Sequence, residues 1–330
     1  MSSDAEKKGQ SSIPGTEEEP QGFGPGHSVA PSPEGKEAAA VVAGGDMPLE
    51  QSSLWADAWR QLRRNPMFII PMVLLLGFTL LALFPEFFAT HDPRDCQLSR
   101  SVQPPTSGHP FGFDVFGCDY YSKVIHGTRV SLVIGLYSVF GAAVIGVVLG
   151  CIAGYYGGIW DAVLARITDI WFAIPTVLGG IVVLSILRTR GVLQVGFVLV
   201  ILSWPTMMRL MRSSVLSAKD QDYVQAAKAL GAGDLRILGK HILPNGIAPV
   251  IVYGTISVGI LIAAEATLSF LGVGLQLPAI SWGLMISGAQ LRILASPHLL
   301  FFPGIFLSVL VFTFILLGDA LRDALDPKLR

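Results

Sequence analysis

The sequence predicts an all-α, polytopic membrane protein with six transmembrane helices and both termini on the cytoplasmic side. Three observations lead to this fold class: an apolar composition, long stretches without charge, and an uneven distribution of Lys and Arg. Hydrophobic residues make up 52% of the 330 residues and charged residues only 14%, well below the roughly 25% of an ordinary soluble domain. The mean hydropathy of +0.58 points the same way.

Charged residues mark the ends of the predicted spans. A helix needs about 20 apolar residues to cross the hydrocarbon core, and a charge at its middle costs roughly 2.5–3.5 kcal/mol on insertion scales. The spans are expected at residues 67–85, 129–161, 170–187, 191–208, 242–271 and 298–318. Residues 272–291 are also uncharged, but Pro278 and four glycines favour a loop with a short interfacial helix near 281–289.

Lys and Arg set the expected orientation, because cytoplasmic loops carry an excess of them. With the N-terminus inside, thirteen of them lie in cytoplasmic segments and seven in external ones, the N-terminal tail excluded. The predicted order is a cytoplasmic tail (1–50), an interfacial helix (51–66), a first transmembrane helix (67–89), an extracytoplasmic loop (90–128), a core of five transmembrane helices (129–321) that includes a cytoplasmic loop at 213–245, and a cytoplasmic C-terminal tail (322–330).

Two N-terminal segments are not expected to cross the membrane. Residues 1–50 are rich in Gly, Pro, Ser and Glu, and they cannot bury enough apolar surface to offset their ordering entropy, so we expect disorder. Residues 53–65 place apolar side chains on one helical face and Asp and Arg on the other. This pattern is typical of a helix in the membrane interface with Trp55 and Trp59 at the headgroups; a simple cytoplasmic lead-in is the alternative.

The sequence lacks the residue patterns that nucleic-acid binding, ATP binding, metal binding and catalysis require. The net charge of -1 argues against nucleic acid as a main partner. Lys follows Gly only after Gly35 and Gly239, and neither pair continues with Ser or Thr, so there is no P-loop for ATP phosphates. The three cysteines make no zinc spacing and the six histidines are scattered. We therefore predict neither a catalytic site nor a metal site.

The loop between the fourth and fifth spans is predicted to present apolar residues to the cytoplasm, outside the bilayer. From Lys219 to Asn245 it reads KDQDYVQAAKALGAGDLRILGKHILPN. Asp220 or Asp222 can cap a first helix and Asp234 a second, with a glycine corner between them. The first helix has an apolar face at spacings of three and four, made of Tyr223, Ala226, Ala227 and Leu230. An apolar patch in water needs a partner, although a helix lying on lipid would explain the stripe alone.

This loop resembles the coupling motif of bacterial ABC-importer permeases, which reads EAA, three residues, Gly, nine residues, then I-x-L-P. The spacing is kept throughout, with two replacements: Gln for Glu and His for Ile. The matching positions are Gln225-Ala226-Ala227, Gly231 and His241-Ile242-Leu243-Pro244. The resemblance covers residues 53–330, and over this range the sequence looks like the C-type permease of oligopeptide or dipeptide importers. Further similar stretches include Asn65-Pro66, His109-Pro110-Phe111-Gly112 and Gly318-Asp319-Ala320-Leu321-Arg322.

The resemblance implies an ABC-importer permease fold and a non-catalytic subunit that forms half of a peptide pathway in the bacterial cell membrane. It implies these partners: a second, B-type permease subunit, two cytoplasmic ABC ATPases that bind ATP and Mg, an extracytoplasmic substrate-binding protein, and membrane lipids. The ATPase-coupling residues would be Asp222, Tyr223, Gln225, Ala226, Ala227, Leu230, Gly231, Leu243 and Pro244. A permease for nickel or another small solute, and an ion-coupled secondary transporter, are the alternatives.

Polar and polarisable residues within the spans are candidates for the translocation pathway: Ser203, Thr206, Met207 and Glu265. Glu265 interrupts the fifth span, and an ionisable residue at membrane depth is a functional candidate by default. Polar contacts between helices are common in membranes, however, so a packing role is the favoured interpretation of Glu265.

Two cysteines, Cys96 and Cys118, lie in the long loop predicted outside the membrane. An extracytoplasmic compartment permits disulfides, so we expect that they can pair. Two unrelated thiols are the alternative, because the sequence does not reveal the separation of their Cα atoms. Cys151 falls within the second span and is expected only to pack.

Overall fold

The computed structural model describes residues 59–325, which are helical apart from turns and isolated β-bridges. Five of the described helices are long and apolar enough to cross a membrane: α3 (Pro66–Leu83), α5 (Tyr120–Tyr156), α8 (Val192–Lys219), α12 (Ala248–Phe270) and α14 (His298–Leu325). The all-α polytopic prediction is confirmed. The expected disordered tail at 1–50, most of the interfacial helix at 51–66 and the end of the C-terminal tail lie outside the described residues.

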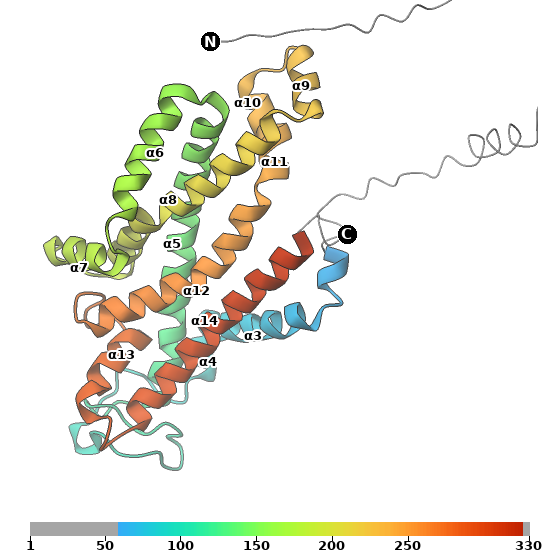
Figure 1. The fold of residues 1–330 in the computed structure, drawn as a ribbon. Helices are drawn as coiled ribbons and strands as arrows, with labels where there is room; N and C mark the ends of the chain where they lie inside the picture. The colour runs from blue at the N-terminus through green and yellow to red at the C-terminus, as the bar shows by residue number, and fades with distance from the viewer. Residues whose placement is uncertain (1–58, 326–330) are drawn as a thin grey trace, which may run out of the picture. The chain divides into compact units, whose positions relative to one another are not determined.

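The third predicted span is wrong as a single helix. Instead of one helix at 170–187, the structure has α6 (Gly158–Phe172) and α7 (Thr176–Ile186), which meet at a bend of 87°. Figure 1 shows α7 running across the direction of α6. Pro175 stands between the two helices with an extended ψ of 124°. Proline lacks a backbone N–H and disfavours helical conformation in the residue before it, so the helix breaks there.

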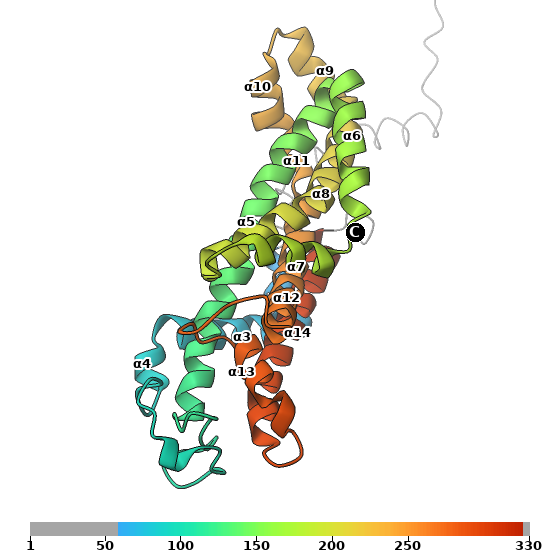
Figure 2. The ribbon, with the colours of Figure 1, turned by 90° about the vertical axis from the view of Figure 1, so that its left-hand side faces the viewer.

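The centre of the molecule is the contact between α5 and α8, the most extensive between any two helices (Figure 2). Three glycines of α5 face α8 at intervals of four residues: Gly146, Gly150 and Gly154. A Cβ added at Gly150 would lie 2.7 Å from the carbonyl oxygen of Met208 and from the Cβ of Met211. Small residues at this spacing let two membrane helices approach closely.

Ion pairs attach α6 to α8. Arg209 of α8 donates to Asp169 at 2.6 Å and to the hydroxyl of Thr168 at 3.2 Å. Arg212 forms a second, bidentate pair with Asp161. Both arginines thus lie within the long helix α8, which continues beyond the predicted span end at residue 208 to Lys219.

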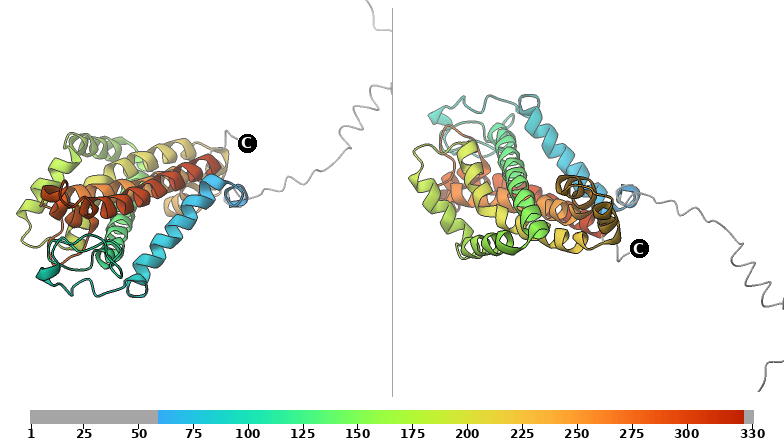
Figure 3. Two further views of the ribbon diagram at one scale, coloured as in Figure 1. Left: turned by 90° about the horizontal axis from the view of Figure 1, so that it is seen from below. Right: turned by 90° about the horizontal axis from the view of Figure 1, so that it is seen from above.

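The other long helices pack around this pair. Helix α14 lies along α12 and α3 (Figure 3). The short helix expected near 281–289 is present as α13 (Trp282–Ala289), and Ser281 caps it by accepting from Leu284 N. Trp282 is fully buried and donates through Nε1 to the carbonyl of Val124 at 2.9 Å, which fixes α13 against α5.

The described part of the chain has two distinct ends. At one end lie α13 and the segment between α4 (Pro85–Phe88) and α5, which contains the short helix η1 (Leu98–Arg100); η3 (Gln290–Arg292) follows α13. At the opposite end, α8 leads into α9 (Asp222–Ala229) and α10 (Asp234–Arg236). Figures 1 and 2 agree on this separation, so the loop predicted to bind a partner and the cysteine-containing loop face away from each other.

Candidate functional site

The predicted partner-binding loop is a helical corner between α8 and α12. After α9 the chain turns at Gly231 and returns through α10, the π-helix η2 (Ile237–Ile242) and α11 (Leu243–Gly246) to α12. We call residues 219–245 the corner segment. The expected short helix, glycine turn and second helix are all present. The second helix is, however, divided in three, and Pro244 stands in the first turn of α11.

The capping residues were predicted wrongly. Gln221, not Asp220 or Asp222, occupies the N-cap position of α9, and Gly233 occupies that of α10. Neither cap forms a side-chain hydrogen bond. Asp222 and Asp234 instead are the first helical residues, where a negative charge still interacts favourably with the positive end of the helix dipole.

The side chains of α9 divide into a buried and an exposed set. Val224 is fully buried and Ala227 is 8% exposed, so this side packs on the rest of the chain. Tyr223, Ala226 and Leu230 are exposed, Leu230 to 89%. Their spacing of three and four places them on one face of the helix. Three of the four predicted apolar residues thus face outward, and Ala227 does not.

Gln225 makes its hydrogen bond inside the chain. Its Nε2 donates to the backbone carbonyl of Lys219, at the end of α8, at 2.9 Å. A glutamate in this place has no proton to donate to a carbonyl oxygen when ionised. The replacement of the motif Glu by Gln therefore ties α9 to α8 and leaves no charge at this position.

A second tie joins the corner segment to α5. The hydroxyl of Tyr155 donates to Asp234 Oδ1 at 2.9 Å, and Lys228 Nζ lies 5.4 Å from the centroid of the Tyr155 ring. Sequence reasoning missed Tyr155 because it is distant in the chain. Leu235 was also missed as a candidate for contact with a partner, although it is 85% exposed beside the same corner. The signal available in the sequence was an apolar residue next to a glycine turn.

Gly231 has a φ of +79°, in the left-handed region that glycine tolerates best. A Cβ added there would meet nothing within 4 Å in this chain. Leu243 is half-buried and Pro244 is exposed at the return to α12. The corner therefore presents Leu230, Gly231 and Pro244 to the surroundings.

The four predicted pathway residues lie in different environments. Ser203 is partly exposed and its hydroxyl donates to Leu199 of its own helix at 2.5 Å, and Thr206 is also partly exposed. Met207 is 1% exposed and packs against Gly146, so its placement does not support a pathway role. Glu265 is fully buried and accepts from Ser269 at 2.7 Å, in agreement with the packing interpretation.

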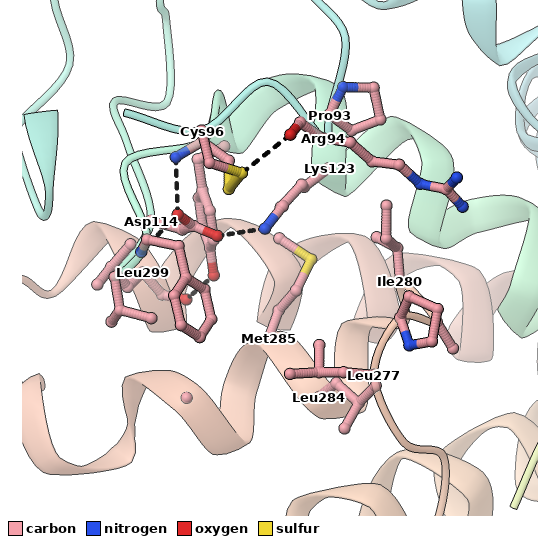
Figure 4. A pocket seen from close by; sticks show the side chains of 17 residues that line it. Pro93, Arg94, Cys96, Asp114, Lys123, Leu277, Ile280, Leu284, Met285 and Leu299 are labelled. Carbon is pink, nitrogen blue, oxygen red and sulfur yellow. Dashed lines mark hydrogen bonds and ion pairs between the residues drawn. A yellow bond between two sulfur atoms is a disulfide. The ribbon is translucent and has the colours of Figure 1, made fainter. Parts of the chain in front are cut away.

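The opposite end of the molecule contains a pocket of about 380 Å³. Figure 4 shows Asp114 and Lys123 paired on one wall, with Leu284 and Met285 of α13 on the other. The wall also includes a disulfide between Cys96 and Cys118, whose Cα atoms are 4.0 Å apart. The bond brings the two ends of a 22-residue stretch together beside the start of α5.

The profile of the binding-protein-dependent transport system inner membrane component matches residues 146–330, and that of the N-terminal TM domain of oligopeptide transport permease C matches residues 53–105. The chain is 38% identical over 279 residues to a dipeptide transport system permease protein of Alkalihalophilus pseudofirmus, covering 84% of this chain and 91% of the relative.

Two further relatives cover a similar length. An oligopeptide transport system permease protein of Bacillus subtilis is 36% identical over 296 residues, 89% of this chain and 97% of the relative. A glutathione transport system permease protein of Pectobacterium atrosepticum is 36% identical over 277 residues, 84% and 92%. With its helices and its corner segment, this chain belongs to the inner membrane components of binding-protein-dependent transport systems, and it is a multi-pass permease of the bacterial inner membrane.

Proposed function

We propose that this permease imports peptides and that the corner segment is its contact with a separate ATPase subunit. The observation that carries the proposal is the exposed stripe of Tyr223, Ala226 and Leu230 next to the turn at Gly231. An exposed apolar stripe on a helix outside the membrane needs a partner with a matching groove. The peptide substrate is supported by the relatives, which are named for dipeptides and oligopeptides.

The corner segment is built to transmit movement. It joins α8 to α12 directly, Gln225 ties α9 to α8, and Tyr155 ties α10 to α5. A force on α9 would therefore reach three of the long helices together. The sequence has no P-loop, so ATP and Mg would be bound by the two ATPase subunits, and this chain would be non-catalytic. A B-type permease subunit would complete the pathway, and an extracytoplasmic binding protein would deliver the substrate.

The alternatives need different features. An ion-coupled secondary transporter has no use for an exposed apolar helix outside the membrane. It requires ionisable residues that line its pathway, whereas Glu265 is fully buried against Ser269. A permease for nickel or another small solute would share the fold, and the names of the relatives favour peptides over it.

The test compares two exposed leucines. Leu230→Asp and Leu98→Asp are each introduced into the chain co-expressed with its neighbouring genes; Leu98 is 75% exposed at the opposite end of the molecule. A charge at the centre of an interface costs about 2 kcal/mol or more, so Leu230→Asp should retain at most about one thirtieth of the ATPase affinity. Leu98→Asp should keep it, and both should insert normally.

Two readouts separate coupling from substrate. Affinity purification of the tagged permease measures ATPase recovery, and uptake of labelled di- and oligopeptides into cells measures transport. Undiminished ATPase recovery with Leu230→Asp, or no ATPase with the unmodified chain, would contradict the docking role. A complex that assembles with the ATPase but takes up no peptide would contradict the proposed peptide substrate and leave the docking role intact.

A further inference from the structure

Two histidines and an aspartate converge in the first loop, defined as residues 89–119 between α4 and α5. His91 lies just after α4, His109 lies in the turn at 106–109, and Asp119 is the N-cap residue of α5. Each side chain offers one ligand atom, and these atoms all lie within 4.8 Å of one another. Three parts of the loop that are distant in sequence thus meet at one point.

The three side chains are held by further contacts. His109 Nδ1 and Asp119 Oδ1 are 2.7 Å apart, and the rings of His91 and His109 stack with centroids 4.3 Å apart. Asp119 Oδ2 accepts from the backbone N–H of Ser122 at 2.8 Å. The hydroxyl of Ser122 accepts from the backbone N–H of His91 at 3.1 Å. Ser122 therefore positions both ends of the cluster.

The three residues of the cluster are buried to different degrees. The side chain of Asp119 is 3% exposed and that of His109 is 16% exposed, whereas His91 is exposed. A buried carboxylate with a second oxygen already bonded to a backbone amide is a fixed ligand, and outer contacts of this kind orient metal ligands. His91 Nδ1 lies 3.0 Å from the hydroxyl of Thr90, and the exposed His91 ring leaves one side of the cluster open to solvent.

The chemistry of the donors favours zinc or another transition-metal ion over calcium and magnesium. Two imidazole nitrogens and one carboxylate oxygen suit zinc, while calcium and magnesium prefer oxygen alone. With bonds of about 2.0–2.1 Å in a tetrahedron, neighbouring ligand atoms lie about 3.3 Å apart. His109 Nδ1 and Asp119 Oδ1 are closer than this, at 2.7 Å. The limit of 4.8 Å within which all three ligand atoms lie is larger than this value. A tetrahedral site would form if His109 Nδ1 and Asp119 Oδ1 moved slightly apart and His91 moved toward them.

We propose that His91, His109 and Asp119 bind one Zn²⁺ ion that fastens the first loop to the start of α5. Each histidine supplies one imidazole nitrogen and Asp119 supplies Oδ1, and the ion takes the place of the proton shared by His109 and Asp119. The fourth position holds water. Sequence patterns do not predict this site, because no two of the three residues stand at a metal-ligand spacing.

The experiment uses the full chain in lipid nanodiscs, purified without a polyhistidine tag, stripped with EDTA and titrated with ZnCl₂ by calorimetry. We expect one ion per chain, no binding of CaCl₂, and an X-ray absorption spectrum with two imidazoles. His91→Ala should weaken binding at least ~10-fold, because loss of outer contacts alone costs 10–100-fold. His91 is exposed, so this variant should fold.

His126→Ala is the matched control. His126 lies on α5 and bonds to the carbonyl of Ser122 at 2.8 Å, outside the three-residue cluster. It should keep the affinity within about twofold. A chain that binds no stoichiometric Zn²⁺, that binds it equally after His91→Ala, or that loses it equally after His126→Ala would overturn the proposal.

Discussion

Ser269 joins the end of α12 to the chain that follows it. Its Oγ donates to Glu265 Oε1 at 2.7 Å and accepts from the backbone N–H of Leu275 at 3.0 Å. All three residues are at most 1% exposed. One hydroxyl therefore bonds to two buried groups, whereas Glu265 Oε2 is a buried oxygen without a hydrogen-bond partner in the described part of the chain.

Ser269→Ala should lower the free energy of unfolding by about 1–3 kcal/mol, because buried partners are left without hydrogen bonds. Ser203→Ala is the control, since that hydroxyl bonds only within its own helix; its effect should stay within about 0.5 kcal/mol. Thermal unfolding in detergent, followed by size-exclusion chromatography, measures both. Equal effects would show that the network around Glu265 is unimportant.

Gly231→Asp should abolish uptake while the protein still inserts into the membrane. Asp tolerates the left-handed conformation better than most residues, and the space around Gly231 is open in this chain, so the loss would come from a partner. Gly272→Asp is the matched control, with the same φ of +79° and nothing within 4 Å. Immunoblots of membranes and peptide uptake measure the two variants; similar uptake in both would argue against a partner at Gly231.

At the scale of elements, the glycines of α5 set how closely α8 can approach. The spacing Gly146, Gly150, Gly154 is present in the sequence as a small-xxx-small pattern. The bracketing charges predict the span, but they do not predict which helix packs against it. The structure supplies that partner, because only the fold places Met208 and Met211 against these glycines.

Gly150→Ala should destabilise the molecule by about 1–3 kcal/mol, since the new methyl group meets a carbonyl and a Cβ that are attached to the backbone of α8. Gly304→Ala in α14 is the control, because a Cβ there meets nothing within 4 Å. The glycine-to-alanine change alone should be neutral or slightly stabilising at such a site. Thermal unfolding of both variants in detergent tests the difference, and an unchanged Gly150→Ala midpoint would contradict the close packing.

The broken third span shows where sequence reasoning stops at this scale. Charges at Asp169 and Arg188 bracketed a stretch of the right length, which predicted one helix at 170–187. Asp169 instead lies inside α6, paired with Arg209 of α8. A charge that finds a partner on another helix no longer marks a span end, and the sequence alone does not reveal such a partner. Pro175 was visible, but proline also occurs within α8 and α14.

For the whole molecule, the hydropathy pattern was sufficient to predict the fold class, and the corner motif together with the further similar stretches along residues 53–330 was sufficient to predict the family. Both depend on local composition or fixed spacing. The tie between Tyr155 and Asp234, and the cluster of His91, His109 and Asp119, depend on contacts between distant segments. Such contacts form when segments distant in sequence fold against one another, and no local pattern encodes them.

The orientation of the molecule is the last prediction. The excess of Lys and Arg predicts that both termini and the corner segment lie in the cytoplasm, and the first loop lies at the opposite end of the described helices. Ser107→Cys in that loop and Ser217→Cys near the end of α8 are matched, exposed substitutions. A Cys151→Ser background removes the one free cysteine among the described residues.

A membrane-impermeant maleimide should label Ser107→Cys in intact spheroplasts and Ser217→Cys only after permeabilisation, because the bilayer separates the two ends. Cys96 and Cys118 should not react while they are paired, so their labelling without reductant would also reveal free thiols. The reverse pattern would invert the topology and place the corner segment outside, where no ATP is available to an ATPase bound to Leu230. The docking role and the cytoplasmic orientation therefore depend on each other, and this labelling tests both.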